Sequence, residues 1–280
     1  LTAEPTAADD GVVAVVRMAL TAGWVIGPVL GSFLAAYAGY RTMLIFVAIA
    51  TLAQVLPLGT LRGTPPASVT ERSATQTTTS ARSAPTLRAM LPLLAFTALY
   101  ICVYAGESVK YAYLPLYMNT QLHLAPEISG AIIGIQPLVE LALMPVAVIV
   151  GRRVGMTRLM AFAAACGVGA NLFFAYSGSA AGLFAGQILM GAVWGVFAAL
   201  GIIVAQRLLP TAVATASAIF LSSTAISSAI GGLAGGLGAA VIGLPLVFVI
   251  PAAFAAIAVI GLLIMSRRES RIASSGAERP

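Results

Sequence analysis

The chain has 280 residues, of which 60% are hydrophobic and 9% are charged, whereas soluble globular domains carry roughly 25% charged residues. This composition excludes a water-soluble fold. The net charge of +6 does not indicate nucleic-acid binding, because the basic residues form short clusters between apolar runs and do not line one polar face.

Apolar runs separated by polar turns predict eight membrane-spanning helices. In chain order they cover residues 12–37, 42–61, 89–118, 127–150, 157–176, 182–205, 212–241 and 245–265. These runs lack the short apolar–polar alternation of β-barrel strands, and helices are therefore the expected spanning element. We predict an all-α integral membrane protein.

Arginines mark alternate connections between these predicted spans. They follow the second, fourth, sixth and eighth spans, whereas the intervening connections hold only Arg41. Because cytoplasmic loops carry the excess of basic residues, this pattern predicts that both chain ends lie in the cytoplasm. The arginines that carry the pattern are Arg62, Arg72, Arg82, Arg88, Arg152, Arg153, Arg158, Arg207, Arg267, Arg268, Arg271 and Arg279.

Residues 63–88 are rich in Thr, Ser, Ala and Pro and nearly devoid of large apolar side chains, which predicts a flexible linker. It separates two spans from six. The segment Gly27–Gly39 aligns without gaps to Gly231–Gly243, so the first two spans look like a copy of the last two. A repeat of this kind predicts two six-helix halves, of which the first is represented by its last two helices.

The first span contains Arg17 and the run Trp24-Val25-Ile26-Gly27-Pro28, and it resembles the fifth helix of bacterial sugar efflux transporters of the major facilitator superfamily. Other stretches resemble the same family in the same order: Leu114-Pro115-Leu116, Gln121-Leu122-His123-Leu124, Leu138-Val139-Glu140, Arg153-Val154-Gly155, Gln187-Ile188-Leu189 and Gln206-Arg207-Leu208-Leu209-Pro210. The spacing Gly23, Gly27, Pro28 and Gly31 also resembles the fifth-helix motif of proton-coupled drug exporters in that superfamily.

The resemblance implies a major facilitator-type bundle with eight of an expected twelve membrane helices. Residues 1–62 would be the end of the N-terminal bundle, 63–88 a cytoplasmic linker, 89–266 the C-terminal bundle and 267–280 a cytoplasmic tail. It further implies a multi-pass protein of the bacterial inner (plasma) membrane. The implied activity is export of a small neutral carbohydrate or other small molecule by alternating access, in exchange for protons. A monomer is expected, although the sequence leaves the oligomeric state open.

A polar aromatic stripe lies within the span 89–118. Tyr100, Tyr104, Glu107 and Tyr111 are spaced four, three and four residues apart, which places them on one helix face. Such a face is not expected to contact lipid, and the resemblance makes it a substrate-binding wall; helix packing is the alternative. Lys110 follows Glu107 by three residues, so the two side chains are predicted to form an ion pair that serves structure or substrate choice.

Glu140 lies deep within the span 127–150 and matches an acidic position of the resembled family. An ionisable residue at that depth is a candidate for proton coupling, and a permanent ion pair with Arg17 is the alternative. Three further polar or aromatic residues are candidate substrate contacts. Gln136 lies one turn before Glu140, and Gln187 and Trp194 share a face of the span 182–205.

Small residues that recur every four positions predict close helix packing or gating. They are Gly23, Gly27 and Gly31 in the first span and Gly231 and Gly235 in the seventh. Pro28 removes a backbone donor and is expected to bend its helix.

Enzyme, metal and cofactor chemistry is not expected. The cysteines Cys102 and Cys166 lie in apolar runs without metal-ligand spacing, and the single His123 has no suitable partner nearby. Two alternatives to sugar export remain: a multidrug or other small-molecule exporter of the same superfamily, and a truncated membrane component that does not transport.

Overall fold

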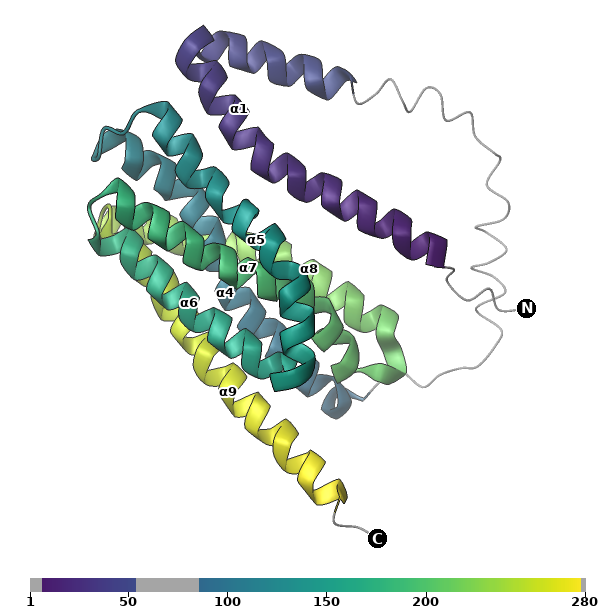
Figure 1. Ribbon diagram of the computed structural model, residues 1–280. Coiled ribbons are helices and arrows are strands. Elements are labelled where there is room, and N and C mark those ends of the chain that lie inside the picture. The colour runs from purple at the N-terminus through teal and green to yellow at the C-terminus, as the bar shows by residue number, and fades with distance from the viewer. Residues whose placement is uncertain (1–6, 54–85, 278–280) are drawn as a thin grey trace.

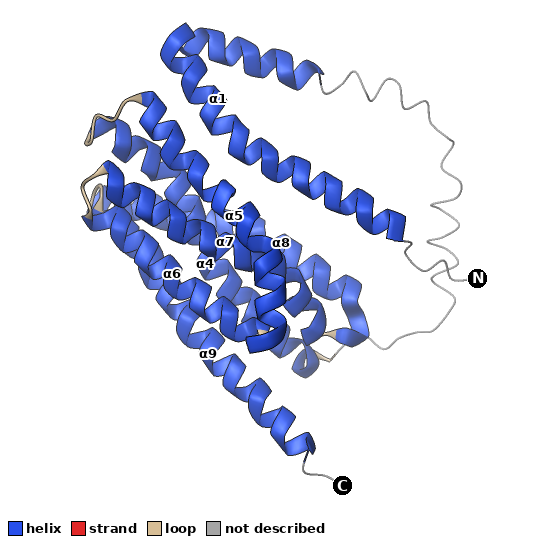
Figure 2. Cartoon of the chain, viewed as in Figure 1, coloured by secondary structure: helices blue, strands red, loops and turns tan. Residues whose placement is uncertain are grey.

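The computed structural model describes residues 7–53 and 86–277 (Figure 1). Within these ranges every regular element is a helix and no strand occurs (Figure 2). The helices are α1 (Ala7–Ala53), α4 (Leu87–Thr120), α5 (Pro126–Val154), α6 (Met156–Tyr176), α7 (Ala180–Leu208), α8 (Val213–Val241) and α9 (Val249–Ala277), with short 3-10 helices at Pro210–Ala212 and Leu246–Phe248. The all-α prediction is confirmed.

Six of the described helices, α4 to α9, are long and apolar enough to cross a membrane. Each coincides with one of the six predicted spans from 89–118 onward, with starts and ends that differ mostly by a few residues. The exception is α9, which continues from the predicted end at residue 265 to Ala277. The predicted end lies where the apolar residues stop. The helix itself continues, because the polar sequence that follows still contains residues with good helix propensity.

The first two predicted spans, 12–37 and 42–61, fall on α1, which bends at Gly39 (Figure 1). Gly39 has φ 78° and ψ 160°, a conformation that glycine adopts without strain. The second arm is a shorter apolar helix, Tyr37–Ala53. Residues 54–61 of the predicted span and most of the predicted linker 63–88 lie outside the described residues.

Glycines allow the helices of the bundle to approach closely. A Cβ added at Gly231 of α8 would lie 2.4 Å from the backbone oxygen of Ala105 on α4. A Cβ at Gly261 of α9 would lie 2.4 Å from Leu99 Cδ2, also on α4. Helix α4 therefore packs on α8 and α9, whereas α5 packs mainly on α7, and α6 packs on α7 and α9.

Helix α1 lies to one side of this bundle and, among the described residues, packs on α5 (Figure 1). No heavy atom of the described chain lies within 4 Å of a Cβ added at Gly23, Gly27 or Gly31. The packing or gating role of this glycine row therefore stays a prediction. The side chains of Arg17, Trp24 and Pro28 lie outside what the structure describes.

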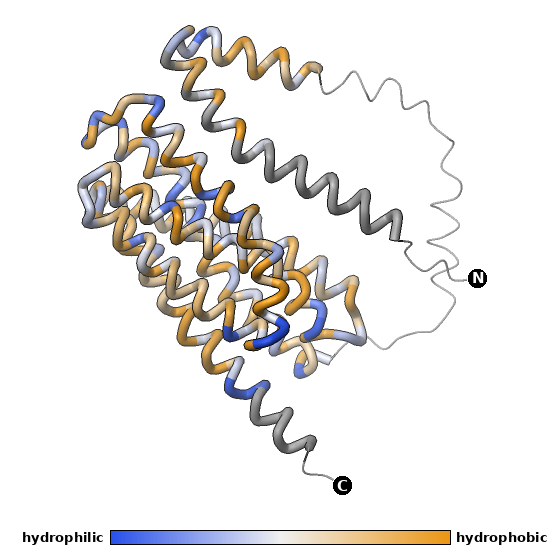
Figure 3. Tube along the Cα trace, in the orientation of Figure 1, coloured by the Kyte–Doolittle hydropathy of each residue, from blue (hydrophilic) through white to orange (hydrophobic). Residues whose placement is uncertain are grey.

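Charged residues gather at one end of the bundle. Figure 3 shows hydrophilic segments at the connection between α5 and α6 and near the end of the described side chains of α9. Because consecutive spanning helices alternate in direction, Arg88, Arg152, Arg153, Arg207 and Arg267 all belong to this end. The hydroxyl of Thr157 on α6 donates a hydrogen bond of 3.0 Å to Glu269 on α9 and joins two helices there.

Candidate functional site

A cavity of about 180 Å³ opens between α4, α5 and α7, and we call it the α4–α5–α7 cavity. Its lining combines aromatic rings, two carboxyl groups and one amide. Tyr104, Glu107 and Tyr111 contribute from α4, Gln136, Pro137 and Glu140 from α5, and Trp194 from α7. Ligand sites commonly combine apolar walls with a few placed polar groups, and this cavity has that composition.

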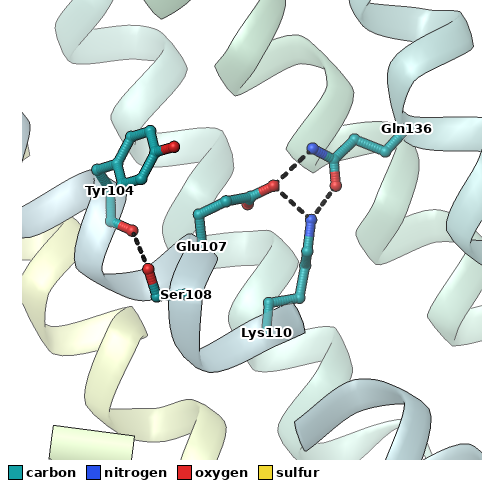
Figure 4. Close-up of polar contacts among 5 residues, drawn as sticks. All are labelled: Tyr104, Glu107, Ser108, Lys110 and Gln136. Atoms are coloured by element: carbon teal, nitrogen blue, oxygen red, sulfur yellow. Dashed lines mark hydrogen bonds and ion pairs between the residues drawn. The ribbon is translucent and has the colours of Figure 1, made fainter. Parts of the chain in front are cut away.

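A polar network of three buried side chains crosses from α4 to α5 at the cavity (Figure 4). Lys110 Nζ lies 2.7 Å from Glu107 Oε1, and Gln136 Nε2 donates to the same oxygen at 2.8 Å. Lys110 also donates to Gln136 Oε1. The predicted ion pair between Glu107 and Lys110 is therefore present. Gln136 forms a hydrogen bond with each of its two members.

Lys110 is held away from the cavity. Its side chain is only 1% exposed, it is not among the lining residues, and its Nζ lies 4.2 Å from the centroid of the Tyr111 ring. An aromatic face attracts a cation at this distance. The ammonium group is thus paired by one carboxylate, one amide oxygen and one ring.

Helix α5 reaches its position because α7 presents glycines to it. A Cβ at Gly191 would lie 2.6 Å from Val139 Cβ and 2.8 Å from Gln136 O, and one at Gly195 would lie 3.3 Å from Glu140 O. These glycines let the α5 backbone come close to α7. The contact brings the segment with Gln136 and Glu140 beside Trp194.

Aromatic rings from α4 and α7 also line the cavity. The Tyr104 and Trp194 rings meet edge to face with centroids 5.2 Å apart, a favourable geometry for aromatic pairs. Tyr100 lies deeper and packs on Tyr104, Trp194 and Phe220, the last at a centroid distance of 4.5 Å.

Two polar atoms among the lining residues are buried and lack a hydrogen-bond partner in the part of the chain that the structure describes. They are Trp194 Nε1, a donor, and Glu107 Oε2, an acceptor. Buried polar groups are nearly always paired, so unpaired groups beside a cavity indicate where a ligand or water binds. Glu140 is half-buried, and no basic side chain of the described residues lies within ion-pair distance of it.

The structure brings together most of the predicted site residues. Tyr104, Glu107, Tyr111, Gln136, Glu140 and Trp194 line one cavity. Tyr100 and Gln187 do not line it. Gln187 is buried, and its amide nitrogen and oxygen have no hydrogen-bond partner among the described residues. The proposed partner of Glu140, Arg17, lies outside the described side chains.

Sequence reasoning missed Pro137, which lines the cavity from within α5. A proline inside a helix cannot donate to the carbonyl four residues earlier, here that of Ile133. The signal was present in the sequence, because Pro137 lies directly between the candidate residues Gln136 and Glu140.

Other cavities have less suitable linings. One of about 380 Å³ lies between α1, α4 and α5, and its lining contains Tyr40, Asn119 and Ser129 as polar side chains but no charged residue. Another of about 410 Å³ lies at the arginine-rich end, where Arg152, Arg207 and Glu269 line it. Among the described residues no group of three or more His, Cys, Asp and Glu side chains is placed to hold a metal.

Comparison with known proteins assigns the family. A sequence model described as Major Facilitator Superfamily matches residues 96–280. A protein of Deinococcus radiodurans named "Putative sugar efflux transporter" is 27% identical over 267 residues, which cover 93% of this chain and 66% of that protein. The chain thus spans about two thirds of the length of this relative. By these matches the chain belongs to the major facilitator superfamily, whose members are membrane transporters and not enzymes.

Proposed function

We propose that the protein exports small sugars or sugar analogues by alternating access and exchanges them for protons. The observation that carries this proposal is the α4–α5–α7 cavity, in which aromatic rings and buried hydrogen-bonding groups face a space of about 180 Å³. This volume is below the ~300–1,000 Å³ typical of sites for drug-sized ligands. The name of the Deinococcus radiodurans relative adds support for sugar efflux.

The cavity suits a carbohydrate for a chemical reason. Tyr104 and Trp194 provide ring surfaces that pack against the C–H faces of a sugar. Trp194 Nε1 and Glu107 Oε2 are buried without a hydrogen-bond partner among the described residues, and hydroxyl groups of a sugar would pair with them.

Glu140 is the proposed proton-coupling residue. It lines the cavity, and no described basic side chain is close enough to neutralise it permanently. An unpaired ionisable group within a membrane helix is costly and is therefore a functional candidate. A Glu140→Gln variant should lose uphill export and its dependence on the proton gradient. Uphill export with an unchanged pH profile in this variant would refute the coupling role.

We also propose how the chain divides. Helix α1 would be the end of an N-terminal six-helix bundle, and α4 to α9 the C-terminal bundle. The separate position of α1, which packs on α5 among the described residues, supports this division (Figure 1).

The experiment measures sugar uptake into inverted membrane vesicles that are prepared from cells expressing the protein. Radiolabelled glucose should accumulate when a proton gradient is imposed, and a protonophore should abolish the accumulation. Vesicles without the protein are the control. Absence of gradient-driven sugar uptake, with the folded protein present in the membrane, would contradict the proposal.

A second candidate function is export of other small molecules, such as drugs. The charged pair Glu107–Lys110 on α4 favours it, because a neutral sugar does not require charges in the membrane interior. Uptake of a fluorescent cationic dye by the same vesicles, without uptake of glucose, would support this alternative over sugar export.

A further inference from the structure

The charge of the α4–α5–α7 cavity restricts the substrate. Two carboxyl groups, those of Glu107 and Glu140, are among its lining residues, and no basic side chain is. The nearby cation, Lys110, is 1% exposed and already bound by Glu107 and Gln136. A molecule in the cavity therefore meets carboxylates and does not meet an ammonium group.

One carboxyl group of the cavity has no cationic partner among the described side chains. Lys110 neutralises Glu107, whereas Glu140 has no described basic side chain within ion-pair distance. An uncompensated charge near the centre of a membrane helix is energetically costly. A proton on Glu140 or a bound cation would offset this cost, and a neutral sugar would not.

The aromatic lining favours the same kind of ligand. Tyr104, Tyr111 and Trp194 line the cavity together with the two carboxyl groups. Aromatic faces bind ammonium groups, and the attraction grows when water is excluded. The contact of Lys110 Nζ with the Tyr111 ring shows this interaction already within the protein.

Two unpaired atoms add a requirement for hydroxyl groups. Trp194 is 7% exposed and Glu107 is 6% exposed, yet Trp194 Nε1 and Glu107 Oε2 have no hydrogen-bond partner within the described part of the chain. Trp194 Nε1 can only donate, so it needs an oxygen acceptor. An apolar cation would leave both atoms without a hydrogen-bond partner, and this loss is unfavourable.

We infer that the preferred substrate is a small hydroxylated amine in its cationic form, of which an amino sugar is the simplest class. Its ammonium group binds at Glu140 among the aromatic rings, and its hydroxyl groups bind at Trp194 Nε1 and Glu107 Oε2. This inference rests on the proposed function, because it names the substrate class for the same cavity.

The test compares three sugars that differ only in the group at carbon 2. Inverted vesicles are loaded with unlabelled glucose, and counterflow of labelled glucosamine, glucose and N-acetylglucosamine is measured without a proton gradient. N-acetylglucosamine keeps the nitrogen atom of glucosamine, but as a neutral amide and not as a charged ammonium group. We expect glucosamine to be preferred over both others by about tenfold, which corresponds to ~1.4 kcal/mol.

Two variants test whether Glu140 causes the preference for glucosamine over glucose. Glu140→Gln should reduce the ratio of glucosamine to glucose counterflow by about tenfold. Glu127→Gln changes an acidic residue at the start of the same helix, outside the cavity, and should leave the ratio unchanged. Thermal unfolding of both purified variants controls for folding. Counterflow is used because it separates substrate choice from proton coupling.

The outcomes separate the two proposals. Transport of glucose without preference for glucosamine would overturn the amine inference and leave sugar export standing. An unchanged ratio in folded Glu140→Gln would also overturn it. If the folded protein transports none of the three sugars, the proposed function fails, and the inference fails with it.

Discussion

At the scale of single residues, the buried pair Glu107–Lys110 places a cation and an anion in the membrane interior, each nearly inaccessible. Pairing makes this possible, because each charge lowers the desolvation cost of the other. Gln136 accepts from Lys110 and donates to Glu107, and so satisfies both groups from a second helix.

Removal of one member of this pair should be strongly destabilising. Lys110→Met leaves Glu107 without its cation, and loss of one partner of a buried pair costs about 3–5 kcal/mol. The double variant Glu107→Gln with Lys110→Met should be clearly more stable than Lys110→Met alone. Unfolding in detergent measures both effects as a double-mutant cycle. Equal stability of the single and double variants would contradict a coupled pair.

The same double variant tests whether the pair also serves transport. It should insert and fold, yet export less sugar than the unchanged protein, because Glu107 lines the cavity. Unchanged export would confine the pair to a structural role.

Tyr104 lines the cavity and offers a ring and a hydroxyl group that can be tested separately. Tyr104→Ala removes the ring that meets Trp194 edge to face and should lower glucose counterflow by about tenfold or more, since aromatic contacts contribute beyond the area they bury. Tyr104→Phe keeps the ring and removes the hydroxyl, so a smaller decrease of about 2- to 10-fold is expected, from the ~0.5–1.5 kcal/mol of one hydrogen bond. Full activity in both variants would remove Tyr104 from the site.

At the scale of helices, adjacent glycines on α8 have different surroundings. Gly231 faces α4, where an added Cβ would lie 2.4 Å from Ala105 O and 2.8 Å from Ser108 Cβ. Gly232 has no heavy atom within 4 Å of an added Cβ. Close packing of α8 on α4 thus depends on one face of the glycine-rich segment.

Gly231→Ala should therefore destabilise the bundle, because α8 must move away from a backbone oxygen; overpacking of this kind costs about 1–3 kcal/mol. Gly232→Ala is the matched control and should be neutral or slightly stabilising, because alanine is the better helix former. Thermal unfolding of the two purified variants gives the comparison. Similar midpoints for both would show that α4 and α8 do not rely on this contact.

At the scale of the whole molecule, the described arginines Arg88, Arg152, Arg153, Arg207 and Arg267 belong to one end of the bundle. The positive-inside rule predicts that this end faces the cytoplasm. In that orientation the connection between α4 and α5 lies outside the cell.

Cysteine labelling tests this orientation. Cys102 and Cys166 are first replaced by serine, and a single cysteine is then introduced at an exposed position, Thr120 or Val154. A membrane-impermeant thiol reagent should label Thr120→Cys in intact cells and Val154→Cys only in inverted vesicles. The reverse pattern would place the arginine-rich end outside.

The sequence by itself determined the membrane class, the six long spans and the pairing of Glu107 with Lys110. These are local properties: hydropathy over a helix length identifies a span, and a separation of three residues places two side chains on one helix face. The same logic placed Tyr104 and Tyr111 on the face that now lines the cavity.

Only the tertiary structure decided which of these residues share a site. Tyr100 belongs to the same stripe as Tyr104, yet it is buried among Phe220 and Trp194 and does not line the cavity. The distinction depends on how α4, α5 and α7 are rotated and how closely they approach. That approach is set by contacts between residues far apart in sequence, such as Gly191 with Val139, which no local pattern contains.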